Sequence, residues 1–98
     1  MNKLSSRQVK QLKSKAHHLN PIFQVGKNGV NDNFLEQIDD VLEKRELIKI
    51  SILQNCLEDK DNIAAQISEG TESHIVTVIG NTIVLYRESK ENKKIELS

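Results

Sequence analysis

The chain is 98 residues long, 29% of its residues are charged, 37% are hydrophobic, and its formal net charge is zero. A chain of this length can form one domain around one core, and the lack of an apolar run of about 18 residues excludes a transmembrane helix. Its single cysteine excludes an internal disulfide and, together with the lack of a secretory signal, predicts a cytoplasmic protein.

The first predicted element is a helix that begins after Ser5 and ends at Asn20-Pro21. Ser5 and Gln8 have the spacing of a capping box, and Pro21 disfavours the helical conformation of Asn20. Apolar residues recur at helical spacing on one side: Val9, Leu12, Ala16 and Leu19. Basic residues share a neighbouring sector of the helix: Arg7, Lys10 and Lys13. The helix can therefore bury one stripe and expose a basic one.

A short strand is predicted at residues 22–25, followed by a glycine-containing loop and a second helix. Asn31 is a favourable N-cap for this helix, and Asp32 places a negative charge in its first turn. The helix is expected to end near Arg45 or Glu46. Its apolar face comprises Phe34, Leu35, Ile38, Val41 and Leu42. Its acidic residues are expected to face solvent: Asp39, Asp40 and Glu43.

The second half of the chain predicts a strand at 47–53, a third helix, and a hairpin. The strand alternates apolar and polar residues, and Gly70 is expected to end the helix. Two β-rich runs, 74–79 and 82–87, flank Gly80-Asn81 and predict a tight turn. Residues 88–98 are expected to form a mobile polar tail, with a short strand at 95–97. The order αβαβαββ predicts a single α+β domain, with helices packed on a mixed four-stranded sheet.

Gly26-Lys27-Asn28-Gly29 lies between a predicted strand and a predicted helix start. Taken alone, the glycine pair also fits an ordinary turn in which one glycine adopts a positive φ. Its position before a helix N-terminus favours an anion, and Lys27 adds a cation. The loop lacks the Gly-Lys-Ser/Thr ending of a nucleotide-binding loop and the third glycine of a dinucleotide site. The remaining specific interpretation is a loop that grips a nucleic-acid backbone.

The zero net charge conceals an uneven distribution. Residues 1–30 carry six basic residues and no acidic one, whereas residues 31–72 carry eleven acidic and four basic residues. The positive part includes the glycine loop and would attract a polyanion. For the lysine-rich helix alone, a solvated surface is an equally good interpretation.

The sequence predicts no catalytic residue, metal or cofactor. His17 and His18 are adjacent on a helix and point apart, and His74 begins a strand elsewhere. The aromatic residues are few. Phe23 and Tyr86 could belong to the core or could stack on bases, and the core is favoured, so backbone contacts are expected to dominate binding.

Four blocks of sequence carry a resemblance to a known family: Leu4–His17, Leu19–Val30, Arg45–Ile50 and Val78–Arg87. In these blocks the chain resembles bacterial YhbY-type proteins with a CRM domain (chloroplast RNA splicing and ribosome maturation). The resemblance covers nearly the whole chain. It implies an αβαβαββ fold similar to the C-terminal domain of translation initiation factor three. It also implies binding of structured RNA and association with large-subunit ribosome precursors.

The resemblance assigns RNA contact to the Gly26–Gly29 loop, with a basic surface on the first helix. The candidate RNA-binding residues are Gly26, Lys27, Asn28, Gly29, Asn31, Arg7, Lys10, Lys13 and Arg87. The expected partner is RNA, specifically 23S rRNA in pre-50S particles, bound by a monomer with no small-molecule substrate and no membrane association. The alternative is a protein-interaction adaptor that uses its charge dipole without contacting RNA.

Overall fold

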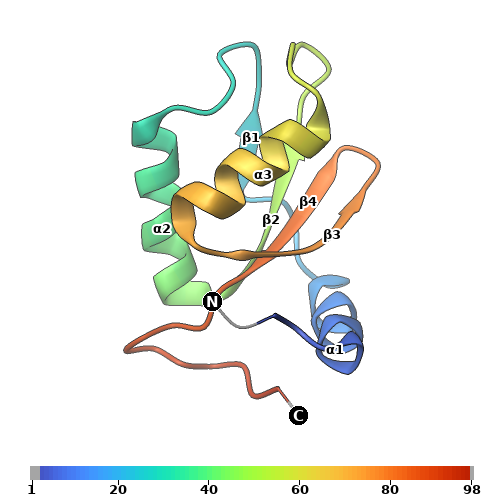
Figure 1. Cartoon of the computed structure of the whole chain (residues 1–98), viewed down its shortest axis with the longest axis vertical. Coiled ribbons are helices and arrows are strands. Elements are labelled where there is room, and N and C mark those ends of the chain that lie inside the picture. The colour runs from blue at the N-terminus through green and yellow to red at the C-terminus, as the bar shows by residue number, and fades with distance from the viewer. Residues whose placement is uncertain (1–2, 98) are drawn as a thin grey trace.

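The structure is a computed structural model that describes residues 3–97. Its elements follow the predicted order, as Figure 1 shows. They are α1 (Ser6–Ala16), β1 (Phe23–Val25), α2 (Asp32–Arg45), β2 (Leu47–Ile52), α3 (Lys60–Thr71), β3 (His74–Ile79) and β4 (Thr82–Tyr86). The α+β class and the αβαβαββ order predicted from the sequence are confirmed.

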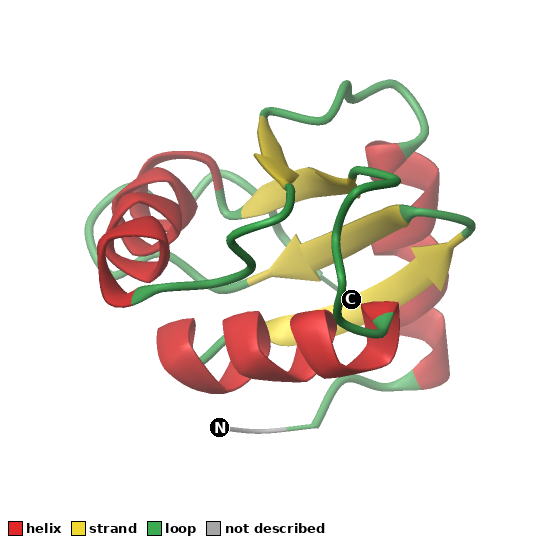
Figure 2. Cartoon of the chain, turned by 90° about the horizontal axis from the view of Figure 1, so that it is seen from above, coloured by secondary structure: helices red, strands yellow, loops and turns green. Residues whose placement is uncertain are grey.

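The four strands form one mixed sheet in the order β1-β2-β4-β3. The pair β1–β2 is parallel, and the pairs β2–β4 and β3–β4 are antiparallel. Viewed from above in Figure 2, the strands lie in the middle of the molecule with the helices around them. The central strands β2 and β4 can therefore bury side chains on both faces.

Each face of the sheet has its own apolar core. On one face, Ile48 and Ile50 of β2 pack with Ile83 and Leu85 of β4 beneath α2 and α3. On the other face, α1 covers a smaller cluster: Leu12, Ala16, Leu47, Val76, Val84 and Tyr86. The alternation in β4 divides its side chains between the two cores, which explains why this strand is apolar on both sides.

The predicted helix starts are confirmed by their caps. In α1 the Ser5 hydroxyl accepts the Gln8 N–H at 3.1 Å, and the Gln8 side chain accepts the Ser5 N–H at 3.0 Å. In α2 the Asn31 side chain accepts the Phe34 N–H at 2.8 Å. The helix α1 ends earlier than predicted, at Ala16, because the Leu19 N–H turns back to the Ala16 carbonyl.

Gly70 does not end α3 as predicted. The helix continues to Thr71, and the left-handed residue after it is Glu72, with φ of 52°. A Cβ added at Gly70 would lie 2.7 Å from Cδ1 of Leu35 on α2. Gly70 therefore allows α2 and α3 to approach closely. A glycine near the end of a predicted helix can serve either as a cap or as a close-packing residue, and the sequence alone does not distinguish the two.

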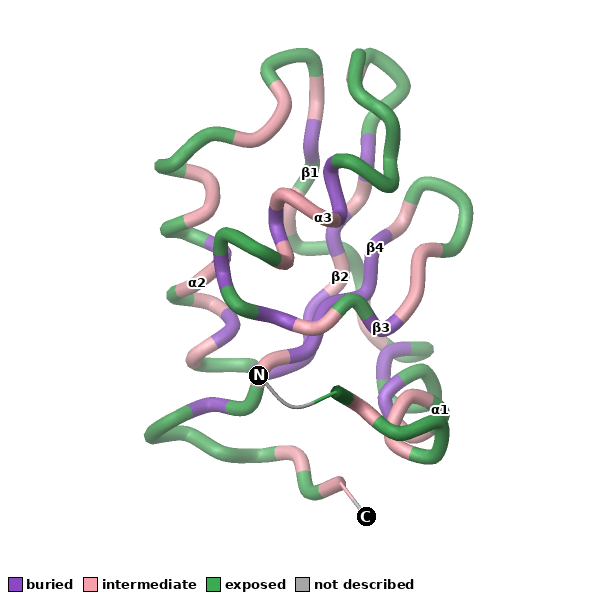
Figure 3. Tube along the Cα trace, in the orientation of Figure 1, coloured by how far each residue is buried: buried purple, intermediate pink, exposed green. Residues whose placement is uncertain are grey.

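The C-terminal segment differs from the expected mobile tail. Within residues 88–97 there is no strand, so the predicted strand at 95–97 is not formed. Instead, the carboxylate of buried Glu46 accepts main-chain N–H groups of Ser89 and Ile95 at 2.7 and 2.8 Å, and also that of Lys94. Figure 3 shows a short buried stretch within this tail.

Candidate nucleic-acid interface

The Gly26–Gly29 segment forms a tight turn between β1 and α2. The Gly29 N–H donates to the Gly26 carbonyl at 3.0 Å, which places Lys27 and Asn28 at the tip. Gly29 has φ of 65°, a left-handed conformation that favours glycine. A Cβ on Gly26 would lie 3.3 Å from Oδ1 of Asn55, so Gly26 serves close packing with the next loop.

The tip of this turn is available to a ligand. Lys27 and Asn28 are exposed, and among the described residues Lys27 has no hydrogen bond or ion pair. The side-chain oxygen of Asn31 is occupied by the α2 cap. What Asn31 can offer to an anion is its main-chain N–H, at the positive end of the helix dipole.

A second loop, residues 53–59, stands beside the first, as Figure 1 shows at the top of the molecule. The Leu53 N–H donates to the Val25 carbonyl at 2.8 Å and joins the two loops at their base. Oε2 of Glu58 lies 3.5 Å from the position of a Cβ on Gly29, and it accepts a hydrogen bond of 3.0 Å from Gln66. Lys27 and Glu58 both line a small hollow of about 250 Å³.

Sequence reasoning missed this second loop. Glu58 is about thirty residues from the glycine pair, and no motif or periodicity relates the two. The proximity arises because the parallel β1–β2 pairing brings both strand ends to one edge of the sheet. In an open sheet with parallel strands, loops at such carboxyl ends commonly form binding sites.

The basic residues of α1 are separated from the glycine loop. Arg7, Lys10 and Lys13 are all exposed, as predicted. In Figure 1, α1 lies at the lower end of the molecule and the loop at the upper end, and the longest dimension is 38 Å. A ligand that touches both must therefore extend along the molecule.

Arg87 makes more contacts within the protein than the sequence indicates. Its side chain is 19% exposed and forms an ion pair with Asp39. It also donates to the main-chain carbonyls of Thr71 and Asp39 at 2.9 and 3.0 Å. These contacts tie the end of β4 to α2 and α3, so much of the hydrogen-bonding capacity of the guanidinium is used within the protein. Asp39, expected to be a solvating residue, is likewise part of this internal network.

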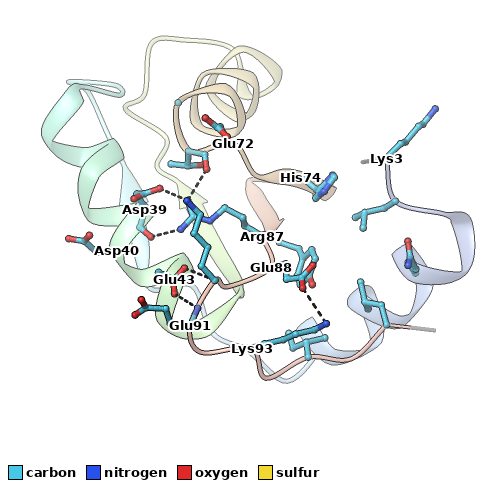
Figure 4. Close-up of a pocket in the computed structure, with 18 residues that line it drawn as sticks. Lys3, Asp39, Asp40, Glu43, Glu72, His74, Arg87, Glu88, Glu91 and Lys93 are labelled. Atoms are coloured by element: carbon cyan, nitrogen blue, oxygen red, sulfur yellow. Dashed lines mark hydrogen bonds and ion pairs between the residues drawn. The ribbon is translucent and has the colours of Figure 1, made fainter. Parts of the chain in front are cut away.

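A larger hollow of about 870 Å³ lies beneath the C-terminal tail, and Figure 4 shows the side chains around it. Some of its charges are satisfied within the protein. Lys93 pairs with Glu88 at 3.2 Å, and Arg87 is held by Asp39. Glu43 accepts the N–H groups of Lys90 and Glu91 and the Ser89 hydroxyl. Lys3 and Lys90 also line this hollow, but its acidic side chains outnumber its basic ones, so it is a poorer candidate for binding a polyanion than the glycine loop.

The hydrogen bonds to Glu43 lower the pKa of its carboxyl group. The Lys90 N–H, the Ser89 hydroxyl and the Glu91 N–H favour the carboxylate and lower the pKa of Glu43 to about 2. For Glu46, burial raises the pKa, but the N–H groups of Ser89, Lys94 and Ile95 outweigh this effect and lower it overall. Glu43 on α2 and Glu46 directly after it thus bind the tail as anionic hydrogen-bond acceptors.

The aromatic residues belong to the interior. Phe23 packs edge-on against Phe34 with ring centroids 5.7 Å apart, and buried Tyr86 stacks on His74. Residues 3–97 contain no cluster of three or more histidine, cysteine or acidic side chains arranged to hold a metal. No helix in the same range combines the length and hydrophobicity needed to span a bilayer.

Comparison with known proteins connects this geometry to a family. Residues 4–87 match the CRS1 / YhbY (CRM) domain. The chain is 63% identical over 94 residues to "Probable RNA-binding protein YqeI" of Bacillus subtilis, covering 96% of this chain and 98% of that protein. It is 40% identical over 93 residues to an "RNA-binding protein" of Haemophilus influenzae, covering 95% and 94% of the two chains. A solution structure from Staphylococcus aureus, 55% identical, superposes with a TM-score of 0.80 over 98% of this chain and 100% of that one.

Proposed function

The chain belongs to the CRS1 / YhbY (CRM) domain family, and from that premise we propose that it binds structured ribosomal RNA and acts, without catalysis, in assembly of the large ribosomal subunit. Two of its relatives are named as RNA-binding proteins. The proposed partner is 23S rRNA in pre-50S particles, bound by one copy of the chain in the cytoplasm.

One observation carries the proposal: the Gly26–Gly29 turn exposes Lys27, whose side chain has no partner within residues 3–97, directly before the N-terminus of α2. The first N–H groups of a helix have no intrahelical partner, and the helix dipole favours an anion there. Lys27 adds a mobile positive charge. The turn can therefore hold a phosphate of the RNA backbone without reading the base attached to it.

The distribution of charge fixes the orientation of the RNA. On α1, the exposed basic residues Arg7, Lys10 and Lys13 extend the attraction beyond the loop. The exposed acidic residues lie on the helices of the opposite face of the sheet: Asp32, Glu36, Asp40, Asp61, Glu69 and others. These acids would repel a polyanion, so RNA docks along the side that carries α1 and the loop.

Titration of a fluorescently labelled rRNA fragment at several salt concentrations tests the proposal. With roughly four to six phosphate contacts, log K is expected to fall by about 0.7 to 0.9 per contact for each unit of log salt concentration. Combining Lys27→Ala with Gly29→Asp is expected to weaken binding strongly, because it removes the cation and adds an anion at the turn.

Lys44→Ala is the matched control, because Lys44 is an exposed lysine on α2, away from the turn. Circular dichroism checks that each variant is folded. Binding without salt dependence would contradict the proposal, as would unchanged affinity in the folded double variant.

The assembly role is tested by crosslinking the protein to RNA in cells and sequencing the bound fragments, which are expected to map to 23S rRNA precursors.

A further inference from the structure

The face of the sheet that α1 covers is divided into an apolar half and a polar half. The apolar half packs under α1 through Leu47, Val76, Val84 and Tyr86. The strands continue beyond the apolar half, and there the same face carries mainly polar residues, with exposed Ile79 of β3 beside Thr82 at its border. These residues, called here the polar sheet face, are Gln24, Lys49, Ser51, Thr77 and Thr82.

The strand register places these residues side by side. Gln24 pairs with Ser51, and Ser51 pairs with Thr82, which forms one row across three strands. Lys49 and Thr77 both pair with Val84 and form the next row. All five residues of the polar sheet face are exposed or half-buried, whereas the alternate residues Ile50, Ile52 and Ile83 are buried on the other face.

Lys49 is an unusual residue for the middle of a sheet. It lies on the central strand β2 and is half-buried, and its side chain makes no ion pair or hydrogen bond among the residues that the structure describes. The polar sheet face contains no acidic residue that could neutralise it. The ammonium group is therefore available to pair with an approaching anion through a charge-assisted hydrogen bond.

The polar sheet face lies between the two basic regions that the structure separates. β2 runs from Leu47, under α1, to Ile52, next to the base of the glycine loop. Lys49 is two residues from Leu47, a distance of about 7 Å along a strand. Gln24, at the other end of the face, is two residues before Gly26.

We propose that the polar sheet face is the floor over which an RNA strand passes from the Gly26–Gly29 loop to α1, with Lys49 holding a backbone phosphate on the way. This inference rests on the proposed function and adds a route and a new contact to it. The hydroxyls of Ser51, Thr77 and Thr82 and the amide of Gln24 can bond phosphate oxygens or ribose hydroxyls. The face has no aromatic residue for stacking, so contact there is with the backbone rather than with the bases.

The test uses the full chain and a fluorescein-labelled RNA stem-loop with a single-stranded extension. Lys49→Gln keeps a polar side chain of similar length and removes the charge. It is expected to weaken binding about three- to tenfold and to reduce the slope of log K against log salt concentration by about 0.7 to 0.9, the value for one phosphate contact. Lys49→Arg keeps the charge and is expected to restore most of the affinity and the slope.

Lys44→Gln, on α2 and therefore on the opposite side of the sheet, is the matched control and is expected to leave both quantities unchanged. A folded Lys49→Gln variant with the affinity and salt slope of the unmodified chain would overturn the route, even if the Lys27 and Gly29 substitutions abolish binding. If the unmodified chain itself does not bind the RNA, the proposed function fails, and the two results are thereby distinguished.

A second measurement does not depend on a substitution. RNA containing thiouridine is crosslinked to the unmodified protein by light, and the modified peptides are identified by mass spectrometry. Crosslinks to the β2 and β4 residues of the polar sheet face are expected together with crosslinks to the glycine loop. Crosslinks confined to the loop and α1, with none on these strands, would contradict the route.

Discussion

At the tip of the β1–α2 loop, two opposite charges line the same small hollow. Lys27 is on one wall and Glu58 on the other, and the Glu58 carboxylate is held by Gln66. A phosphate approaching the turn beside Gly29 would come near this carboxylate and be repelled by it. Glu58 therefore limits the affinity of the loop for RNA, and rearrangement of its side chain would relieve the repulsion.

Replacing this carboxylate with an amide should strengthen RNA binding. Glu58→Gln keeps the oxygen that accepts from Gln66 and removes the negative charge, so affinity is expected to rise about two- to fivefold, an effect that is reduced at high salt. Anisotropy titration measures it, with Glu69→Gln on α3 as a control for loss of an exposed acid elsewhere. Equal affinities for the Glu58→Gln variant and the unmodified chain would show that this carboxylate does not compete with RNA.

Substitution of Arg87 tests whether its main role is to stabilise the fold or to contact RNA. Arg87→Met removes the ion pair with Asp39 and leaves the Thr71 carbonyl without this donor. The expected loss in free energy of unfolding is about 1–3 kcal/mol, measured by urea denaturation, with RNA affinity unchanged. The opposite pattern, normal stability with weakened RNA binding, would return Arg87 to the RNA-contact role that the family resemblance implies.

At the scale of elements, the C-terminal end of α2 and the tail form a unit held by carboxylates. Glu43 has a pKa of about 2 in the folded chain against an ordinary value of 4.5. A lowered pKa contributes stability that is complete above the ordinary value and disappears as the pH falls toward the folded value. The hold on the tail is therefore present at neutral pH and weakens in acid.

Acidification should release the tail before the domain unfolds. Between pH of about 5 and about 2, the NMR amide signals of Ser89, Lys90 and Glu91 are expected to shift toward positions typical of disordered chain. Glu43→Gln should produce a large part of that release at neutral pH, because it removes the charge that these N–H groups share. Signals that stay unchanged across this range, or in the variant, would show that other contacts hold the tail.

Local patterns predicted most of the elements correctly, and the exceptions share a cause. The start of α2 at Asn31 and the turn at Gly80-Asn81 depend on nearby residues, so the sequence revealed them. The end of α3 and the position of the tail depend on distant ones. Gly70 packs closely against Leu35 of another helix, and the tail is held by acids more than forty residues earlier.

The features of the candidate site also divide into those that depend on nearby residues and those that depend on distant ones. The glycine turn and the basic stripe of α1 are local features, and the sequence predicted their exposure. Glu58 and the polar sheet face come to the site only through strand pairing, which no spacing along the chain reveals. The internal contacts of Arg87 could not be predicted, because an arginine at the end of a strand has no local sign that a carbonyl and a carboxylate from two helices surround it.

For the whole molecule, the net charge of zero is less informative than its placement. The acids lie mainly on α2 and α3, and the early basic residues lie on α1 and the glycine loop. Either RNA or a charged protein could respond to such a dipole. If RNA is the ligand, proteins recovered with the tagged chain from cells are expected to be ribosomal and to be lost after nuclease treatment. Partners that survive nuclease would support the protein-adaptor alternative.

The smaller core, under α1, bears on how easily this helix detaches from the sheet. α1 is attached through two fully buried residues, Leu12 and Ala16, and its partners on the sheet come at least thirty residues later in the chain. The larger core under α2 and α3 does not include α1. α1 is thus expected to detach as one cooperative unit, at a lower free energy than global unfolding, and to expose its amides to deuterium. RNA that bridges α1 and the glycine loop would oppose this opening and slow the exchange of amides that it never contacts.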